Sequence, residues 1–520
     1  MDLHAAKHHS PMNENQAGDL THSSKKTVLY DGSCPMCAAI LEKIDRSPQG
    51  DRFDRVDITT DPIPSFLTKG EVEKEIHLID EEGKLYRNAA AILKILEEYP
   101  RLRFLAKIGR LPIIKQTLPI GYDFVAANRH FIIGSTSRIY WLKVVLSLAC
   151  ISGFLLSKKL WLTSRTYPLT PVSEILPSIP FPLDYVLFVL MLVLLGAIMI
   201  SARPRKYIVT FVVISGLLSL GDQSRWQPWF YQYLFMFAAL GFYSWKAADA
   251  HAQGPILNVC RLIVVSIYFW SGLQKVNVDF VGGVFPWMVE PLAGLLPPGL
   301  RIVPLSLGVA VPFLEMGIGT GLLVGRFRRV AVGFALAMHT LILICIGPLG
   351  YNWNSVVWPW NVAMALFVFI LFWKEKGLHL GEIATIRKSL FHTLVFVLFG
   401  IMPAFSLFDL WDSYLSSALY SGNTAESVVY VSDSVIARLP TEIQVLIRGH
   451  SEARNVLSIS RWSFKELNVP PYPEHRIFKN VARTICTHAG NTAEVILSIQ
   501  ERPHWLTGVR ATTRYECSNL

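Results

Sequence analysis

The chain has 520 residues, of which 52% are hydrophobic and only 17% are charged, and its formal net charge is +10. Soluble globular proteins usually carry about 25% charged residues, and the mean hydropathy of this chain is +0.36. The composition excludes a cytosolic multidomain enzyme and a disordered protein, and it predicts an integral membrane protein with soluble ends. No recognised nucleic-acid-binding motif accompanies the positive charge, so we expect no nucleic-acid partner.

The first 25 residues are polar and include His4, His8, His9 and His22, with no central apolar stretch. A secretory signal peptide needs such a stretch. We therefore expect a disordered polar tail at 1–25, although histidines of this density are also found in metal-binding tails.

Two cysteines lie between a predicted strand at 26–30 and a predicted helix at 37–46, in the segment Cys34-Pro35-Met36-Cys37. A helix N-terminus stabilises an anion, so the first thiolate is favoured there, and the second thiol can resolve a mixed disulfide. We predict that Cys34 attacks and that Cys37 resolves.

Two alternatives to a redox pair stay open for these cysteines. A zinc half-site would need a second pair of ligands, and only His77 and His130 follow in this domain, without ligand spacing. The cysteines could also be incidental, although the intervening proline after a strand argues against this.

The segment Tyr30-Asp31-Gly32-x-Cys34-Pro35-x-Cys37 resembles the DCC family of thiol-disulfide oxidoreductases, which are small thioredoxin-like domains. Further similarity lies in a predicted strand at 75–80, a turn at 81–84, a segment at 85–92 that opens a helix, and Tyr122 with Asn128-Arg129. The resemblance covers 26–134 and implies a protein-disulfide reductase type of activity on a protein or small-molecule thiol or disulfide. A substrate-gripping proline before the strand at 75–80 is missing.

The middle of the chain, 135–412, contains apolar segments that approach the roughly 20 residues a membrane-spanning helix needs. We predict about nine spans, which makes this part a polytopic α-helical bundle. They lie near 139–157, 183–201, 207–221, 228–245, 258–275, 302–324, 330–347, 358–373 and 389–409.

Loop charges predict the orientation of this bundle. With the N-terminus in the cytoplasm, the inner loops carry about twelve Lys and Arg residues and the outer loops about six, as the positive-inside rule requires. Trp353, Trp358 and Trp360 cluster at a loop without Lys or Arg, as interfacial aromatic residues do. We expect a bacterial cytoplasmic membrane protein whose N-terminus is cytoplasmic and whose C-terminus is extracytoplasmic.

Ionisable residues within predicted spans are costly and therefore mark candidate sites. Lys275 ends an apolar helix, where it could be a base or could snorkel to the interface. Glu315 and His339 lie in the middle of two later spans, and Asp222 and Arg225 lie between two earlier ones. We predict that these four residues bind a ligand. The alternative is a structural role, in which Glu315 and His339 form hydrogen bonds to neighbouring helices and Asp222 and Arg225 form an ion pair with each other.

The segment Tyr268-Phe269-x-x-Gly272-x-x-Lys275, followed by Asn277 and Asp279, is similar to the HTTM domain, the membrane module shared with vitamin K-dependent gamma-carboxylase. In that family the corresponding lysine is the base that deprotonates vitamin K hydroquinone. The resemblance implies an HTTM-like fold for 135–412, a cavity of quinone size, and a catalytic role for Lys275.

The C-terminal part, 413–520, has ordinary soluble composition, with predicted strands at 427–431 and 492–499 and helices at 434–447 and 473–488. It reads as a small extracytoplasmic α+β domain. Cys486 and Cys517 are predicted to form a structural disulfide, because oxidising compartments favour such bonds. Cys150, Cys260 and Cys345 lie in spans and are expected to pack as small hydrophobic residues.

Together these features predict a membrane-bound thiol-disulfide oxidoreductase whose Cys34/Cys37 pair is coupled to a quinone, a vitamin K-like hydroquinone or a lipid bound near Lys275. No metal is expected. One alternative is a carboxylase-like enzyme in which Lys275 performs the chemistry. Another is a non-enzymatic transporter or scaffold, in which the polar residues serve packing or a solute path.

Overall fold

The computed structural model describes most of residues 25–520. The described stretches are interrupted at 33, 35–36, 38–40, 42–43, 45–46, 101, 112–113, 115–117, 120–121, 124, 127–136, 177, 244, 246–252, 302–305, 374, 376–388 and 450–454. The chain divides into two units, Met1–Tyr140 and Trp141–Leu520, and each is described by itself. The predicted tail at 1–25 lies almost entirely outside the described residues.

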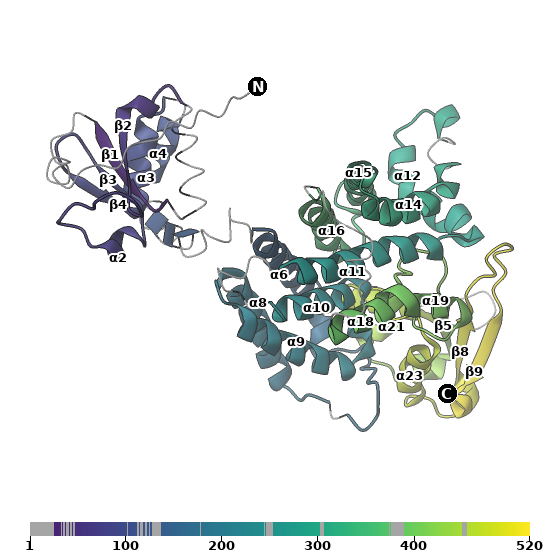
Figure 1. Ribbon diagram of the computed structural model, residues 1–520. Helices are drawn as coiled ribbons and strands as arrows, with labels where there is room; N and C mark the ends of the chain where they lie inside the picture. The colour runs from purple at the N-terminus through teal and green to yellow at the C-terminus, as the bar shows by residue number, and fades with distance from the viewer. Residues whose placement is uncertain are drawn as a thin grey trace. The chain divides into compact units, whose positions relative to one another are not determined.

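The N-terminal unit contains a four-stranded sheet, drawn in purple and dark blue in Figure 1. Strand β1 pairs in parallel with β2 and antiparallel with β3, and β3 pairs antiparallel with β4, so the strand order is β2-β1-β3-β4. The elements are β1 (Lys26–Tyr30), β2 (Phe53–Asp57), α2 (Lys69–Val72), β3 (His77–Ile79), β4 (Leu85–Arg87), α3 (Asn88–Glu97) and α4 (Arg103–Gly109).

Both faces of this sheet are buried, which explains the consecutive apolar residues of β1. Val28 packs on one face with Leu41, Ile44 and residues of α3. Leu29 points to the opposite face and packs with Val56 and neighbouring aliphatic residues, as the alternation of side chains along a strand requires. Of the predicted helix at 37–46 the structure describes Cys37, Leu41 and Ile44, and all three are helical.

The second unit begins with a body of helices, shown in teal and green in Figure 1. The main helices are α6 (Ser137–Leu156), α7 (Lys158–Trp161), α8 (Leu183–Ile200), α9 (Arg205–Leu220), α10 (Pro228–Gly241), α11 (Gln253–Gln274), α12 (Phe285–Ala293), α14 (Val311–Leu323), α15 (Arg328–Ile346) and α16 (Val357–Phe372). A last, composite helix runs through α18 (Leu390–Val395), η10 (Phe396–Ile401), α19 (Met402–Phe405) and η11 (Ser406–Phe408).

Five helical segments of the described chain are long and apolar enough to cross a membrane. They are Arg138–Leu156, Leu183–Ile200, Gln253–Gln274, Arg328–Ile346 and Leu390–Phe408, and each coincides with a predicted span. The other four predicted spans also fall on helices, but these are shorter; α14, for instance, has 13 residues. Nine spans are therefore not confirmed, and the five candidates are consistent with a membrane protein.

The C-terminal part of the second unit contains a five-stranded antiparallel sheet with strand order β6-β7-β5-β8-β9. Val495, Leu497 and Ile499 of β8 alternate into the core, where α23 lies against the same strand. The elements are β5 (Glu426–Val431), α20 (Asp433–Ile436), α21 (Thr441–Gln444), β6 (Ile447–Gly449), β7 (Asn455–Ser458), α22 (Ile459–Leu467), α23 (His475–Cys486), β8 (Val495–Gln500) and β9 (Thr512–Glu516).

One predicted element of this part is wrong in its length. The helix predicted at 434–447 is two short helices, α20 and α21, followed by strand β6. Pro440 lies between the two helices, and a proline lacks the N–H that a continuous helix would use there.

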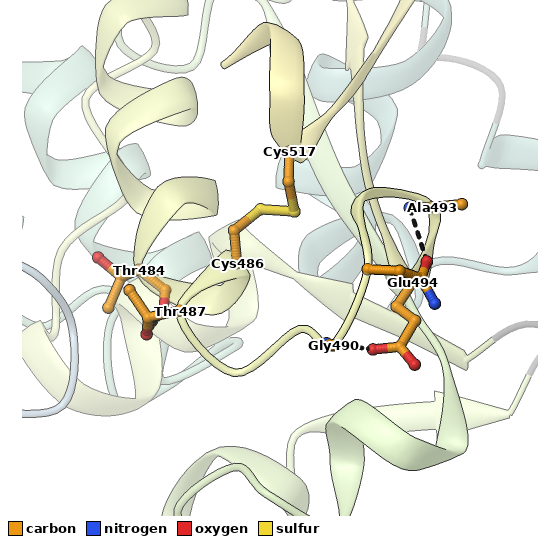
Figure 2. Close-up of a disulfide and its surroundings, with 8 residues drawn as sticks. Thr484, Cys486, Thr487, Gly490, Ala493, Glu494 and Cys517 are labelled. Carbon is orange, nitrogen blue, oxygen red and sulfur yellow. Dashed lines mark hydrogen bonds between the residues drawn. A yellow bond between two sulfur atoms is a disulfide. The ribbon is translucent and has the colours of Figure 1, made fainter.

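A disulfide closes the C-terminal part of the chain. Cys486 at the end of α23 is bonded to Cys517 at the start of η14 (Cys517–Asn519), with 5.8 Å between the Cα atoms. Figure 2 shows the bond beside the loop in which the backbone N–H of Gly490 donates to Glu494. The bond ties the last residues of the chain to a buried helix.

Hydrogen bonds from buried or half-buried side chains join the C-terminal sheet region to the helical body. The Glu466 carboxylate accepts from the backbone N–H groups of Thr166 and Tyr167, at 2.7 and 2.8 Å. Burial raises the pKa of Glu466, but these hydrogen bonds and Lys159 outweigh burial and lower it. The C-terminal region is therefore anchored on the loop that follows α7.

Candidate functional site

The first candidate site is the cysteine pair of the N-terminal unit, at the end of β1. The backbone N–H of Cys34 donates to the carbonyl of Asp31 at 3.0 Å, which forms the turn after the strand. The backbone N–H of Cys37 points at the Cys34 sulfur, with 3.5 Å between N and Sγ. Neither cysteine is in a disulfide. An N–H directed at a sulfur at the start of a helix favours the thiolate form of that sulfur.

Gly32, which precedes the cysteine pair, lies very close to the neighbouring strand. The N–H of Gly32 donates to Asp57 at the end of β2, at 3.0 Å. A Cβ atom at this position would lie 1.9 Å from a carboxylate oxygen of Asp57. A side chain at position 32 would therefore displace the Asp57 carboxylate, which accepts the hydrogen bond from Gly32.

The two thiols differ in access. Cys34 is fully buried, whereas Cys37 is half-buried and lines a small groove of about 50 Å³ with Tyr30, Ile76 and Tyr122. The hydroxyl of Tyr122 accepts from the N–H of Ile76 at 2.7 Å, which holds this wall beside β3. A substrate in this groove meets Cys37 first in the conformation described.

The zinc alternative for the cysteine pair gains no support from His77, one of the two histidines that follow in this domain. The His77 side chain is buried, and its Nδ1 lies 2.9 Å from the carbonyl oxygen of Glu75. His130 lies outside the described residues. Among the residues that the structure describes, no cluster of three or more His, Cys, Asp or Glu side chains suits a metal ion.

The second candidate site is a cavity of about 550 Å³ in the helical body. Residues of α11, α12, α14, α15 and α16 line it, together with Ser417, Leu419 and Tyr420 from the segment that follows the last helix. Most lining side chains are aliphatic or aromatic, so the few polar ones define where a ligand could be recognised.

Lys275 and Glu315 form a buried ion pair on the cavity wall. Lys275 Nζ lies 2.7 Å from Glu315 Oε2 and also donates to the hydroxyl and the carbonyl of Ser271. The two charged residues are only 8% and 7% exposed. The ammonium group of Lys275 is thus paired with Glu315 of α14 on the cavity wall, whereas the snorkelling alternative would direct it to the membrane interface.

Two glycines bring these residues together. A Cβ atom on Gly272 of α11 would lie 2.6 Å from the carbonyl oxygen of Pro312 in α14. A Cβ on Gly319 of α14 would lie 3.0 Å from the carbonyl oxygen of Val265. Small residues allow this close approach of helix backbones, and it places the charge of α11 beside that of α14.

A second polar group on the same cavity is a chain of three side chains. Tyr268 and His339 share a hydrogen bond of 2.6 Å between the hydroxyl and Nε2, and His339 Nδ1 lies 2.8 Å from the amide oxygen of Asn361. All three residues are buried. Tyr268 lies on α11, and Lys275, seven positions later, is the first residue after this helix. At the rise of a helix this spacing corresponds to about 10 Å between the two backbone positions.

The cavity thus contains three of the sequence-predicted site residues, Lys275, Glu315 and His339. Sequence reasoning missed Tyr268 as a site residue, although it lies seven positions before Lys275 in a predicted helix, a spacing that places two residues on one helix face. It also missed Tyr420, whose hydroxyl accepts from the Asn354 amide at 2.6 Å. No sequence signal pointed to this tyrosine.

Asp222 and Arg225 lie elsewhere, in a buried ion cluster of the loops around α9. The Asp222 carboxylate accepts from Arg165 at 2.5 Å and from Thr170 at 2.9 Å. Arg225 donates to the backbone carbonyls of Leu160, Leu218 and Trp161. The two residues do not line the cavity. Their contacts are structural, and their predicted ligand-binding role stays a prediction.

Burial and charge oppose each other in this cluster. Burial raises the pKa of Asp222, but Arg165 and Arg225 outweigh burial, so the pKa is lowered. Burial also lowers the pKa of Arg225 to about 10, although the Asp222 carboxylate counteracts this. The carboxylate therefore stays ionised and holds the two loops together.

Residues 28–135 match the family model of the DCC1-like thiol-disulfide oxidoreductases. The N-terminal unit thus contains a domain of this family, and the match ends where the helical body begins. No curated protein and no solved structure matches the chain.

Proposed function

We propose that the protein is a membrane-bound thiol-disulfide oxidoreductase whose reaction takes place at Cys34 and Cys37. The observation that carries the proposal is the family match at residues 28–135 around a cysteine pair in which the N–H of Cys37 is directed at the Cys34 sulfur. The strand order β2-β1-β3-β4, with β1 and β2 parallel, supports a thioredoxin-like fold for this domain.

The proposed step is a disulfide reduction in two exchanges. Cys34 is buried in the conformation described, so the proposed step requires its sulfur to become accessible to the substrate. The Cys34 thiolate then attacks one sulfur of a substrate disulfide, so that a mixed disulfide forms and one substrate thiolate leaves. The Cys37 thiolate then attacks Cys34, releases the second substrate thiolate, and leaves a Cys34–Cys37 disulfide. The substrate gains two electrons, and a thiol donor must restore the dithiol.

The roles of the two cysteines are distinguished by trapping. With the full chain in detergent and a disulfide-bonded peptide as substrate, Cys37→Ser should accumulate the mixed disulfide, whereas Cys34→Ser should lose turnover and form none. Cys150→Ala, a buried cysteine of the helical body, is the matched control and should keep wild-type turnover. Wild-type turnover of Cys34→Ser would contradict the proposal, and a mixed disulfide on Cys37 alone would reverse the two roles.

We further propose that the cavity binds a lipophilic ligand with polar oxygens, such as a quinone. Its apolar lining suits the ring and tail of such a molecule. The Lys275–Glu315 pair and the Tyr268–His339–Asn361 chain are two separate polar groups on the cavity, which suits a ligand with two oxygens. In this proposal the quinone is an alternative oxidant to the substrate disulfide. When the thiol donor has restored the Cys34/Cys37 dithiol, oxidation of that dithiol to the disulfide releases two electrons and two protons, and the quinone takes them up and becomes a hydroquinone.

The carboxylase-like alternative also has a supporting contact. A lysine can act as a base only after it loses a proton, and Glu315 at 2.7 Å from the Lys275 ammonium can accept that proton. A neutral Lys275 could then take the proton of a hydroquinone. The similarity of 268–280 to the HTTM domain favours this alternative over a transporter or scaffold.

Ligand analysis and turnover separate these proposals. Organic extracts of purified wild type should contain a lipophilic molecule that is depleted in extracts of Lys275→Met. The control is Lys143→Met, because Lys143 is a buried lysine that donates to the carbonyl of Ser201 and does not line the cavity; its extracts should contain the molecule as wild type does. Quinone reduction by a dithiol that needs both Cys34 and Lys275 would support coupling. Identical extracts from both variants would contradict a ligand role for Lys275.

The disulfide between Cys486 and Cys517 supports an extracytoplasmic C-terminus, because cytosolic thiols are kept reduced. A membrane-impermeant maleimide should label a cysteine introduced at the exposed Val445 in intact cells, and label Cys37 only after permeabilisation. Labelling of both positions in intact cells would contradict the proposed orientation.

A further inference from the structure

The connection between β8 and β9, residues 501–511, carries large apolar side chains on the surface. Trp505, Leu506 and Val509 are 57%, 59% and 68% exposed. The tip is ordered by its own backbone, since the N–H of Gly508 donates to the carbonyl of His504 and the N–H of His504 to the carbonyl of Val509, each at 2.9 Å. We call residues 503–509 the hairpin tip; Figure 1 shows its yellow ribbon extending beyond the sheet. Exposed tryptophan and leucine on one short turn need a partner.

One side of the hairpin tip is attached to the end of a candidate membrane span. Helix α11 ends at Gln274, and four residues later the N–H of Val278 donates to the carbonyl of Trp505 at 3.0 Å. The Arg510 guanidinium donates to the Asp279 carboxylate at 2.9 and 3.0 Å. The tip therefore lies at the level at which α11 leaves its apolar stretch.

The other side is attached to the end of a second candidate span, Leu390–Phe408. Arg502 forms an ion pair with Asp409 at 3.1 Å and donates to the hydroxyl of Ser413 at 2.9 Å. It also donates to the carbonyl of Ser406. The hairpin is thus attached to the ends of two candidate spans, and both attachments place it at the level at which a span would leave the bilayer.

The surface around these attachment points is apolar as well. Val278, Leu407, Phe408 and Leu410 are all exposed large hydrophobic residues, and they flank the polar pairs that attach the hairpin. Tryptophan and leucine beside arginine are typical of the boundary between lipid tails and head groups, where an aromatic ring has an apolar and a polar side.

We propose that the hairpin tip inserts into the interface of the bilayer, with Trp505, Leu506 and Val509 in contact with lipid. The occupant of this apolar surface is the membrane itself, because the tip continues the apolar belt of two spans at their ends. Arg502 and Arg510 keep their contacts to Asp409 and Asp279 and so hold the hairpin at the ends of the two spans. The inference rests on the proposed membrane localisation.

The test is a depth measurement on the full chain in lipid nanodiscs. Cys34 and Cys37 are replaced by serine, the remaining three unpaired cysteines are buried, and a bimane label is attached to Trp505→Cys. Val193→Cys, on the exposed face of α8, is the standard for lipid contact, and Val445→Cys is the standard for water. A nitroxide on the lipid acyl chain should quench the labels at 505 and 193 several-fold more than the label at 445.

The outcomes separate the two levels of the argument. If the label at 193 is quenched by lipid but the label at 505 is quenched by aqueous iodide like the one at 445, the hairpin tip is solvent-exposed and the inference is wrong. The inference is equally wrong if neither quencher reaches the label at 505, because a protein partner would then cover the tip. If even the label at 193 escapes lipid quenching, the membrane localisation fails with it.

Discussion

The ion pair between Lys275 and Glu315 offers the sharpest test of the cavity. Lys275 Nζ and Glu315 Oε2 are 2.7 Å apart. At an effective dielectric constant of about 20, opposite charges at this distance attract each other by about 6 kcal/mol. Much of this offsets the cost of removing both groups from water, so the pair as a whole contributes little. Removing one partner is different, because it leaves a buried charge without compensation, which costs about 3–5 kcal/mol.

We therefore expect Glu315→Leu and Lys275→Met each to lower the free energy of unfolding by about 3–5 kcal/mol, and the double variant to return to within about 1 kcal/mol of wild type. The measurement is equilibrium unfolding of the detergent-solubilised chain in mixed micelles with increasing SDS. The exposed pair of Arg438 and Glu494, 3.0 Å apart, is the control, and Arg438→Met should leave the unfolding midpoint unchanged.

Two results would refute this reasoning. If each single variant costs less than about 1 kcal/mol, the cavity solvates its charges as bulk water does, and the pair is not desolvated. If the double variant is as unstable as the two single variants combined, the two side chains stabilise the fold through separate contacts. In that case the ion pair would not be the unit that shapes the cavity wall.

Three further predictions concern the framework around the sites. Asp222→Asn should lower the free energy of unfolding by about 3 kcal/mol. The pKa of Asp222 is lowered in the folded state, so its contribution to stability is present above the unfolded pKa of about 4 and is lost as the pH falls through the lower folded pKa. In acid unfolding experiments the stabilities of wild type and variant should therefore converge. Replacing Cys486 and Cys517 by alanine opens a link across a sequence separation of 31 and should cost about 4 kcal/mol, and a reducing agent should then destabilise wild type but not the variant. Gly272→Val should separate α11 from α14 at the carbonyl of Pro312, 2.6 Å from the new Cβ, and should deplete the cavity ligand, whereas Gly196→Val, where a Cβ meets open space, should not.

Polar residues in apolar helices were predictable, because their cost in a membrane makes each of them a signal. Lys275, Glu315 and His339 were found in this way, and the structure brings them to one cavity. Asp222 and Arg225 gave the same signal but pair within a loop cluster, since a charge that is satisfied by neighbours looks identical in a sequence to a charge that faces a ligand.

Elements with mixed patterns were not predictable. Strand β2 reads Phe-Asp-Arg-Val-Asp, and only Phe53 and Val56 are buried, so its sequence lacks the alternation that indicates a strand. Strand β9 lies at the edge of its sheet and has no buried residue, so its mostly polar sequence also lacks a strand pattern. Tyr420 reaches the cavity from a segment 81 residues after His339, the nearest predicted site residue before it that lines the cavity. Such long-range placement depends on packing that local patterns do not encode.

The charges of the ion pair on the cavity wall cancel, and this bears on which ligands the cavity can accept. The ammonium group of Lys275 and the carboxylate of Glu315 are in contact, so together they carry no net charge, and neither is an isolated charge that a ligand of opposite sign could pair with directly. An anionic ligand would have to displace Glu315 from Lys275 or bring a proton with it. A neutral molecule can therefore bind beside the intact pair, whereas an anion cannot bind to Lys275 without breaking the contact with Glu315.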